Sequence, residues 1–239
     1  RTYGIYNGLT RLINGKIAWA IDNPMTFLLQ GFAVHLWFIT SLILALTILY
    51  GLIWLNKPNK IFYIAIPLYV FGLMAGTYAM TPVGITIEFN TRNGPFLSTL
   101  CIGMGWWLAQ HDFKPTVQLA LTVILTSFLL QVTEYLLLSN IYSLPIEFSQ
   151  ATPNQGKYLI GTAFFGAGVM LLALAVPQLG KKTPLPHWGK FTLGIYVAHL
   201  FVLNYAEKLT TNLPNIMQQL VTAILVYVIT LAMVAILAK

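Results

Sequence analysis

The chain has 239 residues, of which 57% are hydrophobic and only 8% are charged. A soluble domain carries about a quarter charged residues, so this composition excludes an ordinary soluble fold and indicates an integral membrane protein. The net charge of +7 would suit nucleic-acid binding, but no basic run is interleaved with aromatic residues. A single cysteine, Cys101, excludes disulfides and cysteine metal sites, and we interpret it as a small buried hydrophobe.

Seven stretches are apolar enough to be transmembrane helices. A bilayer core about 30 Å thick takes about 20 apolar residues per helix. We therefore predict an all-α, polytopic transmembrane helix bundle with seven spans, at residues 35–55, 61–80, 94–109, 117–138, 158–177, 191–208 and 215–238. The third span is short and contains Gly103 and Gly105, so we expect it to be tilted, broken or extended beyond the membrane.

The opening segment, residues 1–34, is mixed in polarity. Asn23 precedes Pro24, and a residue before proline disfavours the helical conformation, so we predict short amphipathic helices at the membrane surface. The chain begins at Arg1 without a signal-peptide pattern. We therefore expect an N-terminally truncated part of a longer protein, with residues 1–239 forming a single, partial membrane domain.

The charges of the connections predict the orientation in the membrane, because lysine and arginine are in excess in cytoplasmic loops. One alternate set of connections carries Lys57, Lys60, Lys114, Lys181, Lys182, Lys190 and Lys239, and the other carries Arg92, Lys157 and Lys208. We assign the connections with seven basic residues to the cytoplasm. The long polar connections 81–93 and 139–157 are then external, where a large substrate would be recognised.

Two ionisable residues lie inside predicted spans, where each costs several kcal/mol and needs an explanation. Glu134 lies in the fourth span, either paired with a neighbouring helix or lining a polar cavity. His199 lies near the middle of the sixth span, three residues after Tyr196 and therefore on the same helix face. A hydrogen bond between helices is the alternative for His199, but a functional cavity is favoured.

Two further candidates lie at helix ends. His35 opens the first span beside Trp37, although this pair also suits the aromatic belt of a membrane interface. Arg92 precedes the third span, where a cation opposes the helix dipole, so its partner is either Glu88 or an anionic substrate. We assign catalysis to His199, His35, Arg92 and Glu134, and substrate binding to Trp37, Tyr196 and Asn90.

Motifs of soluble enzymes are absent from the sequence. It has no nucleophile elbow, Walker loop, zinc-protease helix or dinucleotide fingerprint. His111 and His187 fall in predicted cytoplasmic loops without metal-ligand spacing. We therefore predict no metal site and no bound cofactor, and interpret these two histidines as solvated.

Three segments carry a family resemblance. They are HLWF at residues 35–38; RNGPF at 92–96 running into GMGWWL at 103–108; and GKFTLGIY at 189–196 followed by His199. In this order they resemble the acyltransferase 3 family, integral-membrane enzymes that acylate bacterial surface glycans. The resemblance covers essentially the whole chain. It implies a core of ten helices, of which three would be missing upstream together with the family's arginine and histidine pair, whose histidine is the presumed catalytic group.

The resemblance also implies the reaction. An acyl group, usually acetyl, would pass from cytoplasmic acyl-CoA to a hydroxyl of a cell-surface polysaccharide or lipopolysaccharide, in the bacterial inner membrane. We expect one cavity through the bundle, with His35, Arg92 and Glu134 lining its outer half and Tyr196 and His199 deeper. The expected partners are acyl-CoA, a glycan or lipid-linked glycan acceptor and the bilayer, and no nucleic acid.

A transporter or flippase for a glycan or a lipid-linked precursor is the alternative function. Such proteins also place polar residues in the middle of spans and break their helices. The sequence shows no inverted repeat, which counts against this class.

Overall fold

The computed structural model describes residues 17, 21–30, 37–87, 89–142, 158–183 and 185–237. This part of the chain is helical and contains no strand, which confirms the all-α prediction. Two compact units divide the chain, Arg1–Pro177 (unit 1) and Gln178–Lys239 (unit 2). The helices are α2 (Pro24–Gln30), α3 (Trp37–Trp54), η2 (Pro58–Lys60), α4 (Ile61–Met74), α5 (Pro95–Gln110), α6 (Val117–Tyr142), α7 (Ile160–Ala175), α8 (Leu185–Gly189), α9 (Thr192–Thr210) and α10 (Asn215–Leu237).

Among the described residues, three helices are long and apolar enough to cross a membrane. They are Trp37–Trp54, Val117–Asn140 and Asn215–Leu237. Shorter apolar helices occupy Pro58–Met74, Ile160–Ala175 and Thr192–Leu203. Every predicted span therefore contains a helix and the chain is a membrane protein, while the number of seven complete spans stays a prediction.

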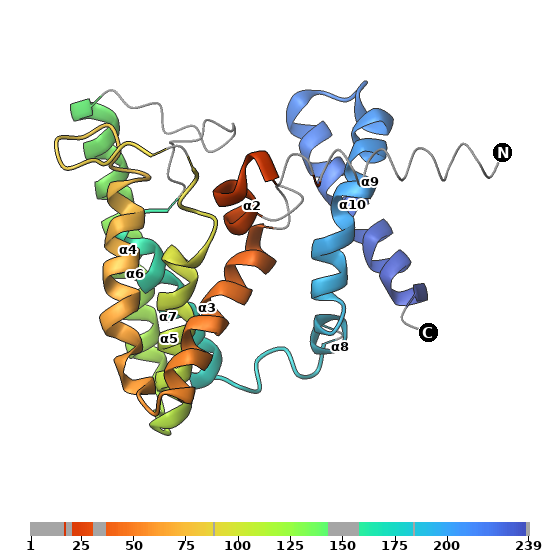
Figure 1. Ribbon diagram of the computed structural model, residues 1–239. Coiled ribbons are helices and arrows are strands. Elements are labelled where there is room, and N and C mark those ends of the chain that lie inside the picture. The colour runs from red at the N-terminus through yellow and green to blue at the C-terminus, as the bar shows by residue number, and fades with distance from the viewer. Residues whose placement is uncertain are drawn as a thin grey trace. The chain divides into compact units, whose positions relative to one another are not determined.

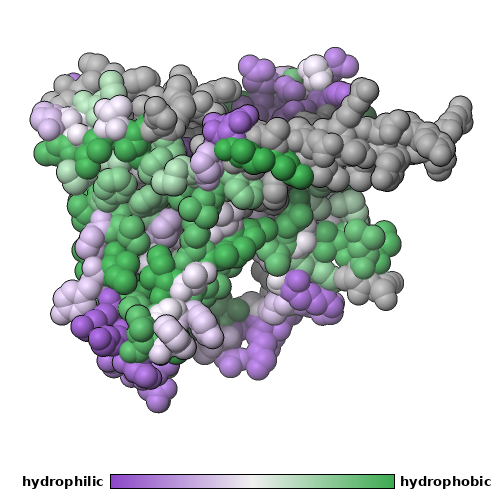
Figure 2. All heavy atoms as spheres, viewed as in Figure 1, coloured by the Kyte–Doolittle hydropathy of each residue, from purple (hydrophilic) through white to green (hydrophobic). Residues whose placement is uncertain are grey.

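The five long helices of unit 1 run alternately in opposite directions (Figure 1). Helix α6 packs on α7, α4 packs on α5, and α5 packs on α3. Figure 2 shows hydrophobic side chains over the flanks of these helices and hydrophilic ones gathered at the end where α3 meets α4. This distribution fits helices whose flanks face lipid and whose connections face water.

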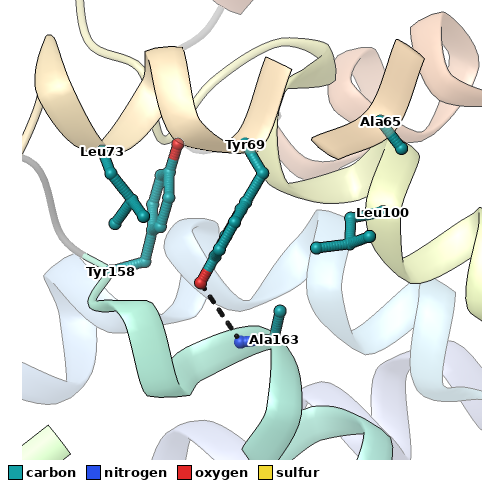
Figure 3. Packing of buried hydrophobic residues seen from close by; sticks show 6 residues of the cluster. All are labelled: Ala65, Tyr69, Leu73, Leu100, Tyr158 and Ala163. Atoms are coloured by element: carbon teal, nitrogen blue, oxygen red, sulfur yellow. Dashed lines mark hydrogen bonds between the residues drawn. The ribbon is translucent and has the colours of Figure 1, made fainter. Parts of the chain in front are cut away.

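The core of unit 1 joins α4, α5 and α7 through two stacked tyrosines (Figure 3). The rings of Tyr69 and Tyr158 are 5.5 Å apart, centroid to centroid, with 22° between their planes. The Tyr69 hydroxyl donates to the carbonyl oxygen of Leu159 at 2.7 Å. Because Leu159 directly precedes α7, this bond fixes the start of α7 against α4.

Three details of α5 and its neighbours correct the sequence analysis. Helix α5 is continuous from Pro95 to Gln110, because Gly103 serves close packing: a Cβ there would lie 3.1 Å from Cγ1 of Ile61. Cys101 is exposed rather than buried, since apolar residues on the outer face of a membrane helix contact lipid. Helix α6 continues to Tyr142, into the predicted external loop, whose remaining residues 143–157 lie outside the described part.

Helices α6 and α7 approach each other most closely at Gly161. A Cβ there would lie 2.6 Å from Cγ of Gln131 and 2.6 Å from the carbonyl oxygen of Ser127. Since a backbone atom cannot move aside, we expect Gly161→Ala to destabilise the protein by about 1–3 kcal/mol. Gly166 lies on the same helix with nothing within 4 Å of its Cβ position, so Gly166→Ala is the matched control. Thermal unfolding in detergent measures both, and equal stability of the two variants would contradict this packing.

Unit 2 is built on a hairpin of α9 and α10. Val202 and Ala206 of α9 pack against Val226 of α10, and the buried hydroxyls of Thr210 and Thr222 hydrogen-bond across the hairpin at 2.7 Å. The short helix α8 precedes α9. This hairpin presents His199 on α9 to the groove described below.

Candidate functional site

Arg92 and Trp37, which the sequence analysis assigned separately, lie together in unit 1. Cζ of Arg92 is 4.8 Å from the centroid of the Trp37 ring, the geometry of a cation–π interaction. Both side chains are partly buried. The ring therefore helps to hold the guanidinium where the loop before α5 meets the start of α3.

The loop that carries Arg92 is itself a tightly bonded turn. The side-chain oxygen of Asn90 accepts the backbone N–H of Arg92 at 2.9 Å, and its carbonyl oxygen accepts the N–H of Asn93 at 3.1 Å. Thr91, 1% exposed, donates its hydroxyl to the carbonyl oxygen of Gly72. The structure thus places Asn90, a predicted substrate-binding residue, in the turn that orients Arg92, and its substrate contact stays a prediction.

A double-mutant cycle tests the pairing of Arg92 with Trp37. We expect Trp37→Ala and Arg92→Gln to show a coupling free energy of about 0.5–2 kcal/mol in thermal or chemical unfolding. Trp37→Phe keeps an aromatic face and should retain most of the interaction. Strictly additive effects of Trp37→Ala and Arg92→Gln would show that the stack contributes nothing.

Glu134 is buried, with 5% of its surface exposed, and its carboxylate binds the start of a neighbouring helix. One oxygen accepts the hydroxyl of Tyr78 at 2.6 Å, and the two oxygens lie 3.1 and 2.9 Å from the backbone nitrogen of Ile160. Ile160 is the first residue of α7, where a negative charge is favoured by the helix dipole and by the unpaired N–H groups. These contacts favour the first of the two sequence interpretations, a carboxylate paired with a neighbouring helix.

The geometry of His199 determines which ring nitrogen holds the proton. Its Nδ1 lies 2.5 Å from the backbone carbonyl oxygen of Tyr196. Because a carbonyl oxygen only accepts hydrogen bonds, Nδ1 must be the donor. In the neutral ring Nε2 then keeps its lone pair and can accept a proton. The rings of Tyr196 and His199 are 5.9 Å apart, centroid to centroid, which agrees with the predicted shared face.

His199 lines a groove of about 1140 Å³ between α9 and α10. Ile195, His199, Leu203 and Glu207 of α9 line it, so the groove runs along the helix over a rise of about 18 Å. Apolar residues surround His199, and the far end of the groove is polar. The polar residues at that end are Glu207, Lys208, Thr211, Gln218 and Gln219.

The predicted site residues are found in three places along the chain. Arg92, Trp37 and Asn90 lie together at the loop before α5. Glu134 of α6 binds the start of α7, and His199 with Tyr196 belongs to unit 2. His35 and Glu88 lie outside the described residues. The single cavity expected to join these groups stays a prediction.

Sequence reasoning missed the partners of these residues. Tyr78, which bonds to Glu134, lies in a loop after α4 and belongs to no motif. Gln218 and Gln219 lie near the start of α10, where polar residues look like an ordinary solvated helix end. His199 within an apolar span was the signal in the sequence that pointed to the groove.

A family model described as "Acyltransferase domain" matches residues 2–239, which include both compact units. No curated protein and no solved structure gives a significant match to the chain.

Proposed function

We propose, because the chain belongs to the acyltransferase 3 family of membrane proteins, that it moves an acyl group, acetyl in the first instance, from cytoplasmic acyl-CoA to a hydroxyl group. The acceptor in this proposal is a bacterial cell-surface polysaccharide or lipopolysaccharide, and the site of action is the inner membrane. The family match is the observation that carries the proposal. The apolar helices support it, because three of those in the described part of the chain are long and apolar enough to cross a membrane.

His199 is the proposed proton acceptor. Its Nε2 takes the proton of the acceptor hydroxyl as the hydroxyl oxygen attacks the thioester carbonyl carbon. A C–O bond forms, the C–S bond breaks, and the proton passes to the departing sulfur to give the free CoA thiol. The hydrogen bond from Nδ1 to the Tyr196 carbonyl supports this role, because it leaves Nε2 as the basic nitrogen.

Arg92 is proposed to bind an anionic group of a substrate, with Trp37 limiting the motion of its side chain. A guanidinium binds carboxylate or phosphate through two parallel hydrogen bonds. For Glu134 we propose a positioning role, since Tyr78 and the start of α7 already occupy its carboxylate. His35 remains a proposed catalytic residue on the strength of the HLWF segment alone.

The test is a transfer assay in membranes. Membranes with and without the full-length protein are incubated with acetyl-CoA labelled in the acetyl group, and the surface glycans are extracted and treated with mild alkali. We expect label on the glycan only when the protein is present, and its release by alkali because the bond is an ester. Unlabelled glycan in the presence of folded protein and donor would refute the proposal.

A further inference from the structure

We propose that the cavity beside α8 binds the nucleotide phosphates of acyl-CoA, and that the cavities adjoining it lead the acyl-bearing arm of this donor to His199. The inference rests on the proposed function for the identity of the donor. It assigns a donor site on the basis of cavity lining, charge and neighbouring cavities within unit 2.

The cavity beside α8 is basic and aromatic on one side and apolar on the other. It encloses about 670 Å³. His187, Trp188 and Lys190 line one wall, and small or apolar residues of α10 line the other. Nζ of Lys190 lies 4.8 Å from the centroid of the Phe191 ring, so an ammonium group stands beside an aromatic surface. This lining suits a ligand that combines negative charge with a planar ring.

Within unit 2, the sequence around α8 is rich in lysine and poor in acidic residues. Lys181, Lys182 and Lys190 fall within ten residues of one another, and Glu207 is the one acidic side chain between Gln178 and Lys239. Along α9, Glu207 lies about 25 Å from Lys190, at the 1.5 Å rise of an α-helix. At that separation, beyond two Debye lengths in physiological salt, it neutralises little of the lysine charge. A phosphate-bearing ligand is the partner that this charge favours.

A small middle cavity neighbours both the cavity beside α8 and the groove that His199 lines. The middle cavity holds only about 160 Å³, and it shares Trp188 with the first cavity and Ile195 and Tyr227 with the groove. At about 30 Å³ for each water molecule, the middle section has room for a thin chain and not for a bulky group. Along the helix axis, at a rise of about 1.5 Å per residue, the backbones of Lys190 and His199 are about 14 Å apart. A flexible arm fixed by its phosphates at Lys190 could therefore present a thioester at His199.

The headgroup of an anionic lipid carries the same phosphate chemistry and is the competing ligand. Lysine clusters beside membrane helices attract such lipids. Two features favour acyl-CoA over a lipid. The neighbouring cavities share lining residues in the direction of His199, and Trp188 offers an aromatic face on which an adenine ring can stack.

The experiment compares two donors that differ in the nucleotide. Purified protein in phosphatidylcholine vesicles is assayed with acetyl-CoA and with acetyl-pantetheine, which lacks the nucleotide and its phosphates. We expect Lys190→Gln to raise the KM for acetyl-CoA roughly three- to tenfold, with kcat and the KM for acetyl-pantetheine unchanged. Lys190→Arg should restore most of the affinity. Lys57→Gln, an exposed lysine in the connection between α3 and α4, is the matched control and should leave both KM values unchanged.

Each other outcome overturns the inference. An unchanged KM for acetyl-CoA, or an equal rise for both donors, would show that Lys190 does not bind the nucleotide. Stabilisation by phosphatidylglycerol that depends on Lys190, without any change in the KM for acetyl-CoA, would assign the cavity to lipid.

Equilibrium binding of labelled CoA separates this inference from the proposed function. Lys190-dependent CoA binding by a protein that transfers no acetyl group would refute the function and leave the site standing. The opposite result is that the unchanged protein transfers acetyl, while the Lys190→Gln variant binds CoA as tightly as the unchanged protein. This result would refute the site and leave the function standing.

Discussion

Replacing His199 with alanine is expected to lower kcat for acyl transfer by about 10²- to 10⁴-fold, the contribution usual for a positioned general base. The KM for the donor should change little, because the imidazole acts on the acceptor hydroxyl in the transition state. Nε2 is the reacting atom, because Nδ1 donates a hydrogen bond to the carbonyl oxygen of Tyr196. Initial rates with labelled acetyl-CoA measure the effect.

His111→Ala is the control for this result. His111 is exposed, lies against the ring of Trp107 and approaches its carbonyl oxygen at 2.8 Å, so we expect full activity. Both variants should unfold at the temperature of the unchanged protein, because His199 makes its described hydrogen bond within its own helix. Full transfer activity in a correctly inserted His199→Ala variant would remove this residue from the reaction.

Replacing Glu134 with alanine is expected to lower the free energy of unfolding by about 3–5 kcal/mol, the cost of removing one partner of a buried, charged interaction. The substitution leaves the hydroxyl of Tyr78 and the N–H of Ile160 without their acceptor. The start of α7 then loses both its negative charge and its link to the loop after α4.

Glu134→Gln separates structure from chemistry at this position. It keeps a side-chain oxygen that can accept from Tyr78 or Ile160, so its loss of stability should be about 1–3 kcal/mol. If Glu134 is a positioning residue, this variant should retain transfer activity at temperatures where it is folded. A fully stable Glu134→Gln variant without activity would instead return Glu134 to the catalytic residues.

The arrangement of helices was largely predictable from the sequence, because long apolar runs in a membrane protein leave the backbone few alternatives to a helix. The limits of that reasoning appear at α5. A glycine inside an apolar span suggested a broken helix at Gly103. In the structure, the missing side chain of Gly103 instead allows α5 to pack closely against Ile61. A glycine within a span can interrupt a helix or allow close packing, and only the neighbouring helix decides between the two.

The site was predictable in part. A polar residue inside a span must be satisfied in some way, and the contacts of Glu134 with Tyr78 and the start of α7 agree with this expectation. The identity of those partners depends on contacts across the chain: Tyr78 lies 56 residues from Glu134, and no spacing rule connects them. The Arg92 and Trp37 pair shows the same limit, since each was singled out by its helix end and the contact between them appears only in three dimensions.

The most direct test of the proposed acyl transfer measures both products of one reaction. Purified protein in vesicles is given acetyl-CoA and a glycan acceptor, and free CoA thiol and ester-linked acetyl are measured together. We expect one free thiol for each ester formed. In the His199→Ala variant, the rates of thiol release and of ester formation should fall together. Movement of the glycan across the membrane without ester formation or thiol release would contradict it and indicate a flippase.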